Sequence, residues 1–374
     1  MNESERAAAV RSWFEGSGAA PLSLQINPTM SCNLNCLFCR RQDQLPRFYK
    51  DFKELSDEKY LEMIAEAVAM GVKNINIKGG GEPLIRHGVI EQLVPIIKRG
   101  RVSASLITNG TQITASLADC FVKNGWDEIS ISLDAPRAEI HDHLRDKKDT
   151  FRRVLEGLEM INAAKGRHKT GSPTLKFHSV LTTLNIELVH ELVELAARHR
   201  VAEVELDSMN PNEPSSHPLI LTERDVVLFQ DRIPELISLA ARLGVRNNFE
   251  NFRRREYATR TEQSRRDLAP VPESVPRHRT VYDDIPCFFP WFHCDITPDG
   301  SIVPCCYGEG YVSEGNLHRL SFKEAWRGGG MEEYRSRIRK GTMNAFCKSC
   351  TACFMDQNKA VRSALRKEAA VETA

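Results

Sequence analysis

The sequence predicts an α/β fold in which six strand–helix units form a curved, partly open parallel barrel, followed by a small cysteine-rich domain. Strand and helix patterns alternate from residue 22 to about residue 208, which is typical of βαβ units and a parallel sheet. The strands themselves alternate between apolar and polar residues, and this second observation predicts the curvature. Spaced cysteines after residue 285 predict the second domain.

Six segments carry the strand pattern: 22–27, 72–78, 102–108, 128–134, 175–181 and 202–208. The first helix pattern between them places five apolar residues on one helical face: Tyr60, Met63, Ile64, Ala67 and Val68. Asp57 and Glu58 suit the positive end of that helix, and Gly71 suits its end. A longer helix is expected over residues 221–245, and residues 253–284 read as a linker or lid.

Alternation within the strands predicts a polar inner face. Ile129 and Ile131 interleave with Ser130 and Ser132, whereas parallel strands that are covered on both faces normally read as continuous apolar runs. One face should therefore pack on helices while the other lines a wet lumen that binds a ligand. The alternative is a sheet with one solvent-exposed face.

Composition limits the possible functions. The chain has 374 residues, more than one typical domain, and 51 basic residues against 50 acidic ones. This balance gives no electrostatic footprint for nucleic acid or an anionic membrane, and no apolar run approaches a membrane span. The N-terminus lacks an apolar signal core. Eleven cysteines in an unexported chain favour metal binding over disulfides, so we expect a cytoplasmic protein.

Three cysteines directly after the first strand form the sequence's most specific pattern. Cys32, Cys36 and Cys39 have the spacing CxxxCxxC, and three thiolates can hold three irons of a cubane cluster. The fourth iron would keep an open coordination position, as a reactive metal centre requires. A structural zinc knuckle or scattered buried thiols are the alternatives.

With Phe38 directly before its third cysteine, this triplet resembles the radical S-adenosylmethionine (SAM) superfamily. The resemblance implies a (β/α)6 TIM-like partial barrel and a [4Fe–4S] cluster whose open iron binds the amino and carboxylate groups of SAM. It further implies reductive cleavage of SAM to methionine and a 5′-deoxyadenosyl radical, with an electron donor such as flavodoxin or ferredoxin.

Other strand ends carry further motifs of the superfamily. Residues 79–83 resemble its GGEP motif, which binds the SAM amino group, and in related enzymes a serine and an arginine hold the ribose or carboxylate. The resemblance assigns SAM contacts to Phe38, Gly80, Gly81, Glu82, Pro83, Asn109, Ser132, Asp134, Arg145 and His178. Arg145 could instead be a surface arginine, and His178 a satisfied core histidine.

Glu205 and Asp207 should face the same lumen from the sixth strand. They are candidates for hydrogen bonding to a substrate or for base catalysis. The alternative is a salt bridge inside the barrel with Lys78 or Lys176.

The second domain resembles the SPASM/twitch extension of radical SAM enzymes, which carries an auxiliary [4Fe–4S] cluster. The resemblance assigns its ligands to Cys287, Cys305, Cys347 and Cys350. Because only Cys353 follows, the shorter twitch-like form fits better than a second auxiliary cluster. A zinc ribbon is the alternative. Three more cysteines lie near this site and could be alternative ligands, hydrogen-atom donors or crowded neighbours: Cys294, Cys306 and Cys353. Cys120 is expected to be a core thiol.

The sequence thus divides into an N-terminal extension, the barrel, a linker or lid, the auxiliary cluster domain and a polar tail: 1–21, 22–252, 253–284, 285–356 and 357–374. Only 31 residues precede Cys32, fewer than the leader-binding domain of many peptide-modifying relatives. The spacing of the auxiliary cysteines is similar to that in aminoglycoside dehydrogenases of antibiotic pathways.

We therefore expect a small polar substrate such as a sugar, nucleoside or aminocyclitol. Its expected fate is a two-electron oxidation with the auxiliary cluster as electron acceptor. Radical epimerisation with a cysteine donor, as in sugar epimerases, is the main alternative. A peptide maturase and a non-catalytic iron–sulfur or zinc module are further ones.

Overall fold

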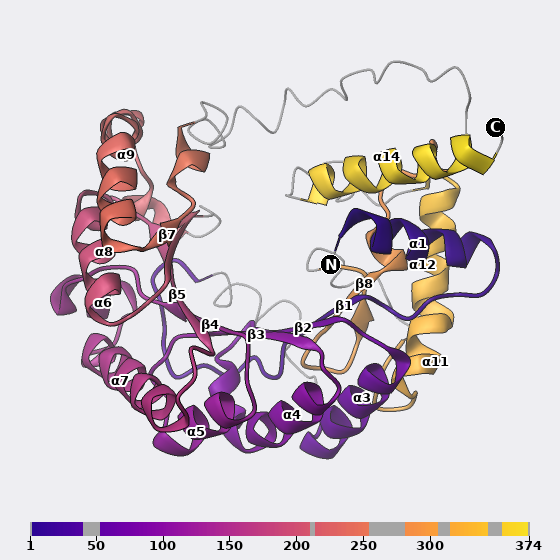
Figure 1. Ribbon diagram of the computed structural model, residues 1–374, viewed down its shortest axis with the longest axis horizontal. Helices are drawn as coiled ribbons and strands as arrows, with labels where there is room; N and C mark the ends of the chain where they lie inside the picture. Colours follow the sequence, from indigo (N-terminus) through magenta and orange to yellow (C-terminus); the bar gives the residue numbers. More distant parts are fainter. Residues whose placement is uncertain are drawn as a thin grey trace.

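The computed structural model describes residues 2–39, 53–209, 214–253, 281–305, 315–342 and 354–372. Within these residues a single nine-stranded sheet has the order β7-β6-β5-β4-β3-β2-β1-β8-β9. Figure 1 shows the sheet bent into an open arc with helices along its outer side. This arrangement confirms the predicted α/β fold with a partial barrel.

Seven parallel strands form the barrel side of the sheet: β1 (Ser23–Ile26), β2 (Asn74–Ile77), β3 (Ser103–Thr108), β4 (Glu128–Ser132), β5 (Thr174–Leu181), β6 (Glu203–Ser208) and β7 (Arg246–Asn247). The outer helices are α3 (Asp57–Met70), α4 (His87–Arg99), α5 (Ala115–Lys123), α6 (Ala138–Leu144), α7 (Thr150–His168), α8 (Val189–Arg198) and α9 (Glu223–Leu243). The six predicted strand segments are confirmed as β1 to β6, and α9 confirms the longer helix.

The strand alternation places apolar side chains under the helices and polar ones inside the arc. Ile129, Ile131 and Phe177 are fully buried in the main core, while their neighbours along β4 and β5 are mostly half-buried polar residues. Helix α3 begins at the capping residue Ser56 and ends at Gly71, whose φ of 94° is the left-handed conformation that glycine favours. Both ends agree with the sequence signals.

The cysteine-rich domain continues the barrel sheet. Strand β8 (His293–Ile296) pairs in parallel with β1, and β9 (Ile302–Val303) turns back antiparallel to it. The turn between them contains Gly300, which has a φ of 76°. Helices α11 (Phe322–Arg327) and α12 (Gly329–Arg339) follow. The auxiliary domain is therefore joined to the barrel by backbone hydrogen bonds, which the sequence did not predict.

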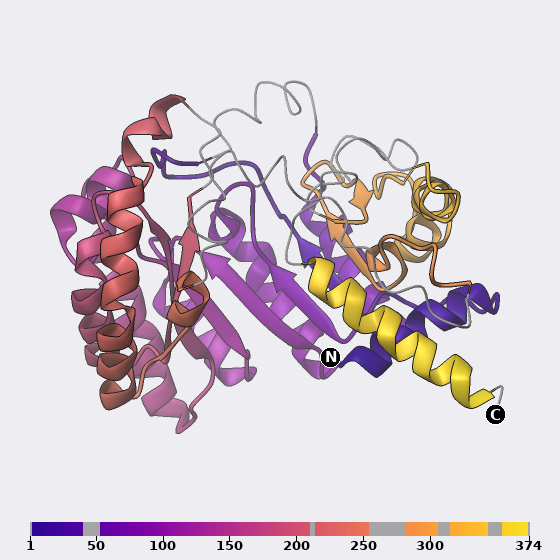
Figure 2. The same ribbon diagram turned by 90° about the horizontal axis from the view of Figure 1, so that it is seen from above.

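The two chain ends pack together on this domain. Helix α1 (Glu3–Phe14) lies beside α14 (Phe354–Glu372), as Figures 1 and 2 show. Val10, Val361 and Leu365 are buried in a second core with Trp291. Most of the segment expected as a polar tail, residues 357–374, belongs to helix α14, and these spaced apolar residues give that helix a buried face. Among the described residues, no helix combines the length and apolar character needed to cross a bilayer.

A buried cation joins α1 to the auxiliary domain. The guanidinium of Arg335 lies 3.8 Å from the ring centroid of Trp13 and 4.3 Å from that of Trp326. Its Nε donates to the carbonyl oxygen of Pro290 at 2.9 Å, and its Nη2 donates to that of Trp326 at 3.0 Å. Burial lowers the pKa of Arg335 to about 10, so the side chain stays charged at neutral pH.

We predict that Arg335→Met destabilises the protein, because two carbonyls lose their donors and both cation–π contacts disappear. The expected loss in the free energy of unfolding is about 2–4 kcal/mol, measured by urea denaturation. Arg339→Met is the control, since the Arg339 side chain is 36% exposed. Equal unfolding midpoints for Arg335→Met and the wild type would contradict the role given to this cation.

Candidate functional site

The loop that carries Cys32, Cys36 and Cys39 follows β1 at the carboxyl edge of the sheet, where open α/β folds bind their ligands. The glycine run after β2 packs directly against its start: the N–H groups of Gly81 and Glu82 donate to the carbonyls of Thr29 and Ser31 at 3.0 and 2.9 Å. A Cβ on Gly81 would lie 2.1 Å from the Ser31 oxygen. Only glycine permits this approach.

The end of β3 holds the same loop from a second side. The amide of Asn109 donates to Asn33 Oδ1 at 2.9 Å, and the amide of Asn33 donates to Thr111 Oγ1 at 2.8 Å. Asn33 lies between the first two cysteines of the triplet, so these hydrogen bonds fix the position of the loop between Cys32 and Cys36. Asn109, predicted as a SAM contact, lies beside the cysteine loop.

The end of α6 and the residues after it hold the loop from a third side. The Leu37 N–H donates to the Leu144 carbonyl at 3.1 Å, and Lys147 Nζ donates to the Asn33 carbonyl at 2.9 Å. Three separate parts of the barrel thus fix the position of the cysteine loop.

Glu82 connects the glycine run after β2 to the end of β3. Its carboxylate accepts from Thr108 Oγ1 at 2.6 Å, the Asn109 N–H at 2.7 Å and the Leu84 N–H at 2.9 Å. The Leu84 bond also caps the short 3-10 helix η1 (Pro83–Arg86). Burial raises the pKa of Glu82, and the three donors oppose that shift. The side chain organises the site, and its contact with SAM stays a prediction.

We predict that Glu82→Gln destabilises the protein by about 1–3 kcal/mol, because one oxygen becomes an NH2 group that faces buried donors. Thermal and urea unfolding of the cluster-free chain measure this loss. Glu62→Gln is the control, since the Glu62 side chain is 66% exposed. A loss no larger than that of the control would contradict the structural role of Glu82.

Arg145 is a buried cation beside the second cysteine. Its Nη2 lies 2.7 Å from Asp134 Oδ2, its Nη1 donates to Cys36 Sγ at 3.6 Å, and the guanidinium lies 5.5 Å from the centroid of the Phe38 ring. Burial lowers the pKa of Arg145, but Asp134 and Cys36 outweigh it and hold that pKa above its usual value. The surface alternative for Arg145 is therefore wrong.

Two opposing effects act on the thiol of Cys36. Burial raises the pKa of its thiol to about 11, although the charge of Arg145 opposes that shift. His141 accepts from the Asp134 N–H at its Nδ1 with a separation of 3.2 Å, and burial and Arg145 lower its pKa. The neutral imidazole orders the backbone there. A loop of three sulfur donors with an arginine against one sulfur fits an iron–sulfur cluster, since positive charge favours thiolates.

The inner face of the arc brings three predicted residues into one row across neighbouring strands. Ser132 is in register with His178, and His178 with Glu205. Asp207 Oδ2 lies 3.8 Å from His178 Nε2, and the Asp207 side chain is 62% exposed. His178 is half-buried on the polar face, so the core alternative for it is wrong.

Lys176 is paired with other carboxylates on this face. Its Nζ lies 3.0 Å from Glu128 Oε2 and 3.3 Å from Glu203 Oε2, so the alternative in which Lys176 neutralises Glu205 or Asp207 is wrong. The catalytic roles of Glu205 and Asp207 stay predictions.

Comparison with known families decides the identity of the barrel. Residues 26–196 match the radical SAM superfamily and residues 287–351 match the SPASM iron–sulfur cluster-binding domain. The chain thus contains a radical SAM domain followed by a SPASM domain. Its radical SAM domain implies a [4Fe–4S] cluster and SAM, and its SPASM domain implies auxiliary iron–sulfur clusters.

Curated relatives cover part of the chain. It is 32% identical over 186 residues to mycofactocin maturase MftC of Mycolicibacterium smegmatis, covering 50% of this chain and 44% of that protein. It is 30% identical over 185 residues to a probable GTP 3′,8-cyclase of Thermococcus kodakarensis, covering 50% of this chain and 56% of that one. The chain thus spans about half the length of these relatives.

Solved structures share the fold over more of the chain. Streptococcus suis SuiB bound to S-adenosylmethionine has a TM-score of 0.63 at 16% identity, covering 93% of this chain and 77% of SuiB. A structure of anSMEcpe with bound AdoMet and a peptide has a TM-score of 0.58 at 20% identity, covering 88% of this chain and 86% of that one. At these identities the likeness establishes the fold alone.

A polar chain that the sequence did not predict lies on the inner face of the radical SAM barrel. His293 Nε2 lies 2.7 Å from Asp295 Oδ1, and Gln25 Nε2 donates to Asp295 Oδ2 at 2.8 Å. Gln25 and Asp295 are register partners of β1 and β8. The alternation of residues 293–296 was the available signal, but nothing in the sequence shows that β8 joins the barrel sheet.

Cys294 does not face this polar chain. It is fully buried in the main core, its register partner is the apolar Leu24, and burial raises the pKa of its thiol well above the ordinary value. Its predicted role as a hydrogen-atom donor is wrong, because alternation along β8 turns its side chain toward the apolar face. Cys306 and Cys353 lie outside the described residues.

The SPASM domain shows two of its four predicted ligands. Cys287 and Cys305 are partly buried against the second core. Cys347 and Cys350 lie outside the described residues, as does most of the segment expected to be a linker or lid. Sulfur donors that share one apolar surface fit a cluster shielded from water.

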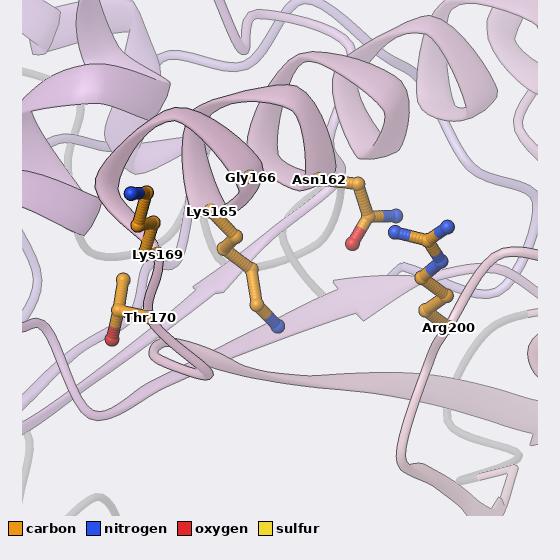
Figure 3. A pocket seen from close by; sticks show the side chains of 6 residues that line it. All are labelled: Asn162, Lys165, Gly166, Lys169, Thr170 and Arg200. Atoms are coloured by element: carbon orange, nitrogen blue, oxygen red, sulfur yellow. The ribbon is translucent and has the colours of Figure 1, made fainter.

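A basic cavity of about 380 Å³ lies away from these sites. Figure 3 labels the residues that line it. Asn162, Lys165 and Gly166 lie in α7, Lys169 and Thr170 lie in the segment before β5, and Arg200 lies in the segment before β6. Burial and the charge of Arg200 lower the pKa of Lys165. These segments precede their strands, so the cavity lies at the opposite edge of the sheet from the cysteine loop.

Proposed function

We propose that this radical SAM enzyme abstracts a hydrogen atom from a carbon of a small polar substrate, such as a sugar, nucleoside or aminocyclitol, and oxidises it by two electrons. One observation carries the proposal: most of the inner-facing side chains across β1 to β6 are polar. Its side chains include Gln25, Asn76, Ser105, Ser130, Lys176, His178 and Glu203. Half-buried hydrogen-bonding groups on this face favour substrates that can pair with them.

The carboxyl edge of the barrel supports binding of SAM. Cys32, Cys36 and Cys39 would hold the cluster, and Arg145 and Ser132 would hold SAM beside it. Reductive cleavage of SAM at that cluster, with electrons from a donor such as flavodoxin or ferredoxin, supplies the radical that removes the hydrogen atom. The residues of the chain orient SAM and substrate, while the helices outside the sheet exclude water from the apolar face.

Oxidation of a carbinol also requires a proton acceptor and an electron acceptor. The proton goes to a base on the inner face, where His178 and Asp207 lie 3.8 Å apart. The auxiliary cluster of the SPASM domain, which Cys287 and Cys305 would help to hold, would supply the electron acceptor. Burial of Cys294 removes one of the three cysteines considered as hydrogen-atom donors, and Cys306 and Cys353 remain the candidates for the alternative reaction, epimerisation.

Modification of a peptide is the second candidate function. SuiB has been solved bound to the precursor peptide SuiA, and this chain matches that structure with a TM-score of 0.62. The partial match to mycofactocin maturase also favours a peptide. The two candidates differ in which compounds accelerate formation of 5′-deoxyadenosine.

We predict that Arg145→Gln weakens SAM binding about tenfold to a hundredfold, since a lost charge-assisted hydrogen bond contributes about 1.5–3 kcal/mol. Equilibrium binding of SAM to the anaerobically reconstituted protein measures this change. Arg145→Lys is the matched variant, because it keeps a positive charge beside Asp134. If Arg145→Gln bound SAM with wild-type affinity, Arg145 would not contact SAM, and its role would be structural, through its ion pair with Asp134.

We predict that substrate is oxidised without incorporating solvent hydrogen. A panel of sugars, nucleosides, aminocyclitols and peptides is first tested for increased 5′-deoxyadenosine formation. The reaction of the active compound is then run in deuterated water and analysed by mass spectrometry. A ketone or aldehyde without deuterium at the reacting carbon supports oxidation. A redox-neutral product with one deuterium there would show epimerisation instead, and stimulation by peptides alone would overturn the small-molecule assignment.

A further inference from the structure

One face of helix α14 runs along the segment that carries Cys287. Three residues spaced four apart make the contacts: Asn358, Arg362 and Arg366. Arg362 Nη2 donates to the Ile285 carbonyl at 2.6 Å, and Arg366 Nε donates to Asp283 Oδ1 at 2.6 Å. Residues at this spacing share one helix face, so α14 holds the segment at successive points.

Asn358 makes the contact nearest the cysteine. Its side chain is buried, and its Oδ1 accepts from the Phe288 N–H at 2.7 Å. Its Nδ2 donates to Cys287 Sγ at 3.7 Å. The Phe288 N–H can only donate, so it fixes the orientation of the amide, and the NH2 group must face the sulfur.

We propose that Asn358 is a positioning residue of the auxiliary cluster: it holds Cys287 in place and donates a hydrogen bond to its sulfur. This inference rests on the assignment of Cys287 as a cluster ligand. A donor to a ligating sulfur withdraws negative charge, which favours the reduced cluster and raises its reduction potential. Asn358 lies beyond the residues matched to the SPASM domain, 287–351, so α14 completes that domain's cluster site.

The first cysteine site shows the same arrangement with a charged donor. Arg145 donates to Cys36 Sγ at 3.6 Å from a position 109 residues away in sequence, and Asn358 reaches Cys287 across 71 residues. In both sites a buried side chain from a distant element approaches one ligand sulfur. Because the Asn358 amide is neutral, its effect on potential should be smaller than that of a buried cation at the same distance.

The test uses the full chain with Cys32, Cys36 and Cys39 replaced by alanine, so that only the auxiliary cluster is present. Asn358→Asp keeps an oxygen for the Phe288 N–H but replaces the donor beside Cys287. Gln357→Glu is the matched control, because it makes the same change of charge at the adjacent, partly exposed position. Iron and sulfide are counted after anaerobic reconstitution, and the midpoint potential is measured by redox titration followed by EPR.

Asn358→Asp is expected to retain the cluster and to lower its reduced-to-oxidised ratio about tenfold at the wild-type midpoint, equivalent to about 59 mV for one electron. Gln357→Glu should shift the ratio less than threefold. A wild-type midpoint in Asn358→Asp would overturn the inference. Absence of iron from the triple-alanine protein would also overturn the inference, because Cys287 would then not be a cluster ligand. That result would not test which substrate the enzyme oxidises.

A second measurement does not depend on the stability of any Asn358 variant. Pulsed EPR of the reduced auxiliary cluster, in protein labelled with 15N at its asparagine side chains, should detect 15N coupling through the N–H···S bond. Absence of this coupling would overturn the proposed hydrogen bond.

Discussion

The cysteine loop depends on a buried carboxylate. Glu82 accepts three hydrogen bonds from η1 and the end of β3, while its own N–H and that of Gly81 donate to the chain just before Cys32. A buried carboxylate is costly unless donors satisfy it, so these elements must assemble together. The arrangement fixes the loop to the sheet without any contribution from the cysteines themselves.

A second constraint sets the relation between the two cysteine sites. Because β8 pairs with β1, the SPASM domain is part of the same sheet as the radical SAM barrel. Arg335 adds a second connection, between α1 and the SPASM domain. The separation of the two proposed clusters is therefore governed by backbone hydrogen bonds and a shared core. A fixed separation suits the proposed transfer of an electron from substrate to the auxiliary cluster, since the acceptor cannot drift away from the lumen.

Much of the barrel could be predicted from local pattern. Period-two alternation located β1 to β6, and the apolar spacing with Gly71 located α3 and its end. The cysteine triplet and the motifs at strand ends indicated the radical SAM family. Local pattern is insufficient where a short segment has two possible environments. The sequence permits an accessible Cys294 and a polar tail over residues 357–374, whereas Cys294 lies in the core and α14 buries Val361 and Leu365.

The sequence by itself determined which segments are strands and helices and which strand face is apolar, because those features depend on neighbours within a few residues. Only the tertiary structure decided that Arg145 lies against Cys36, that Asn358 lies against Cys287 and that His293 and Asp295 join the inner face. These contacts depend on how distant elements pack. The energies that select them, desolvation and hydrogen bonding of buried polar groups, arise only when the chain excludes water.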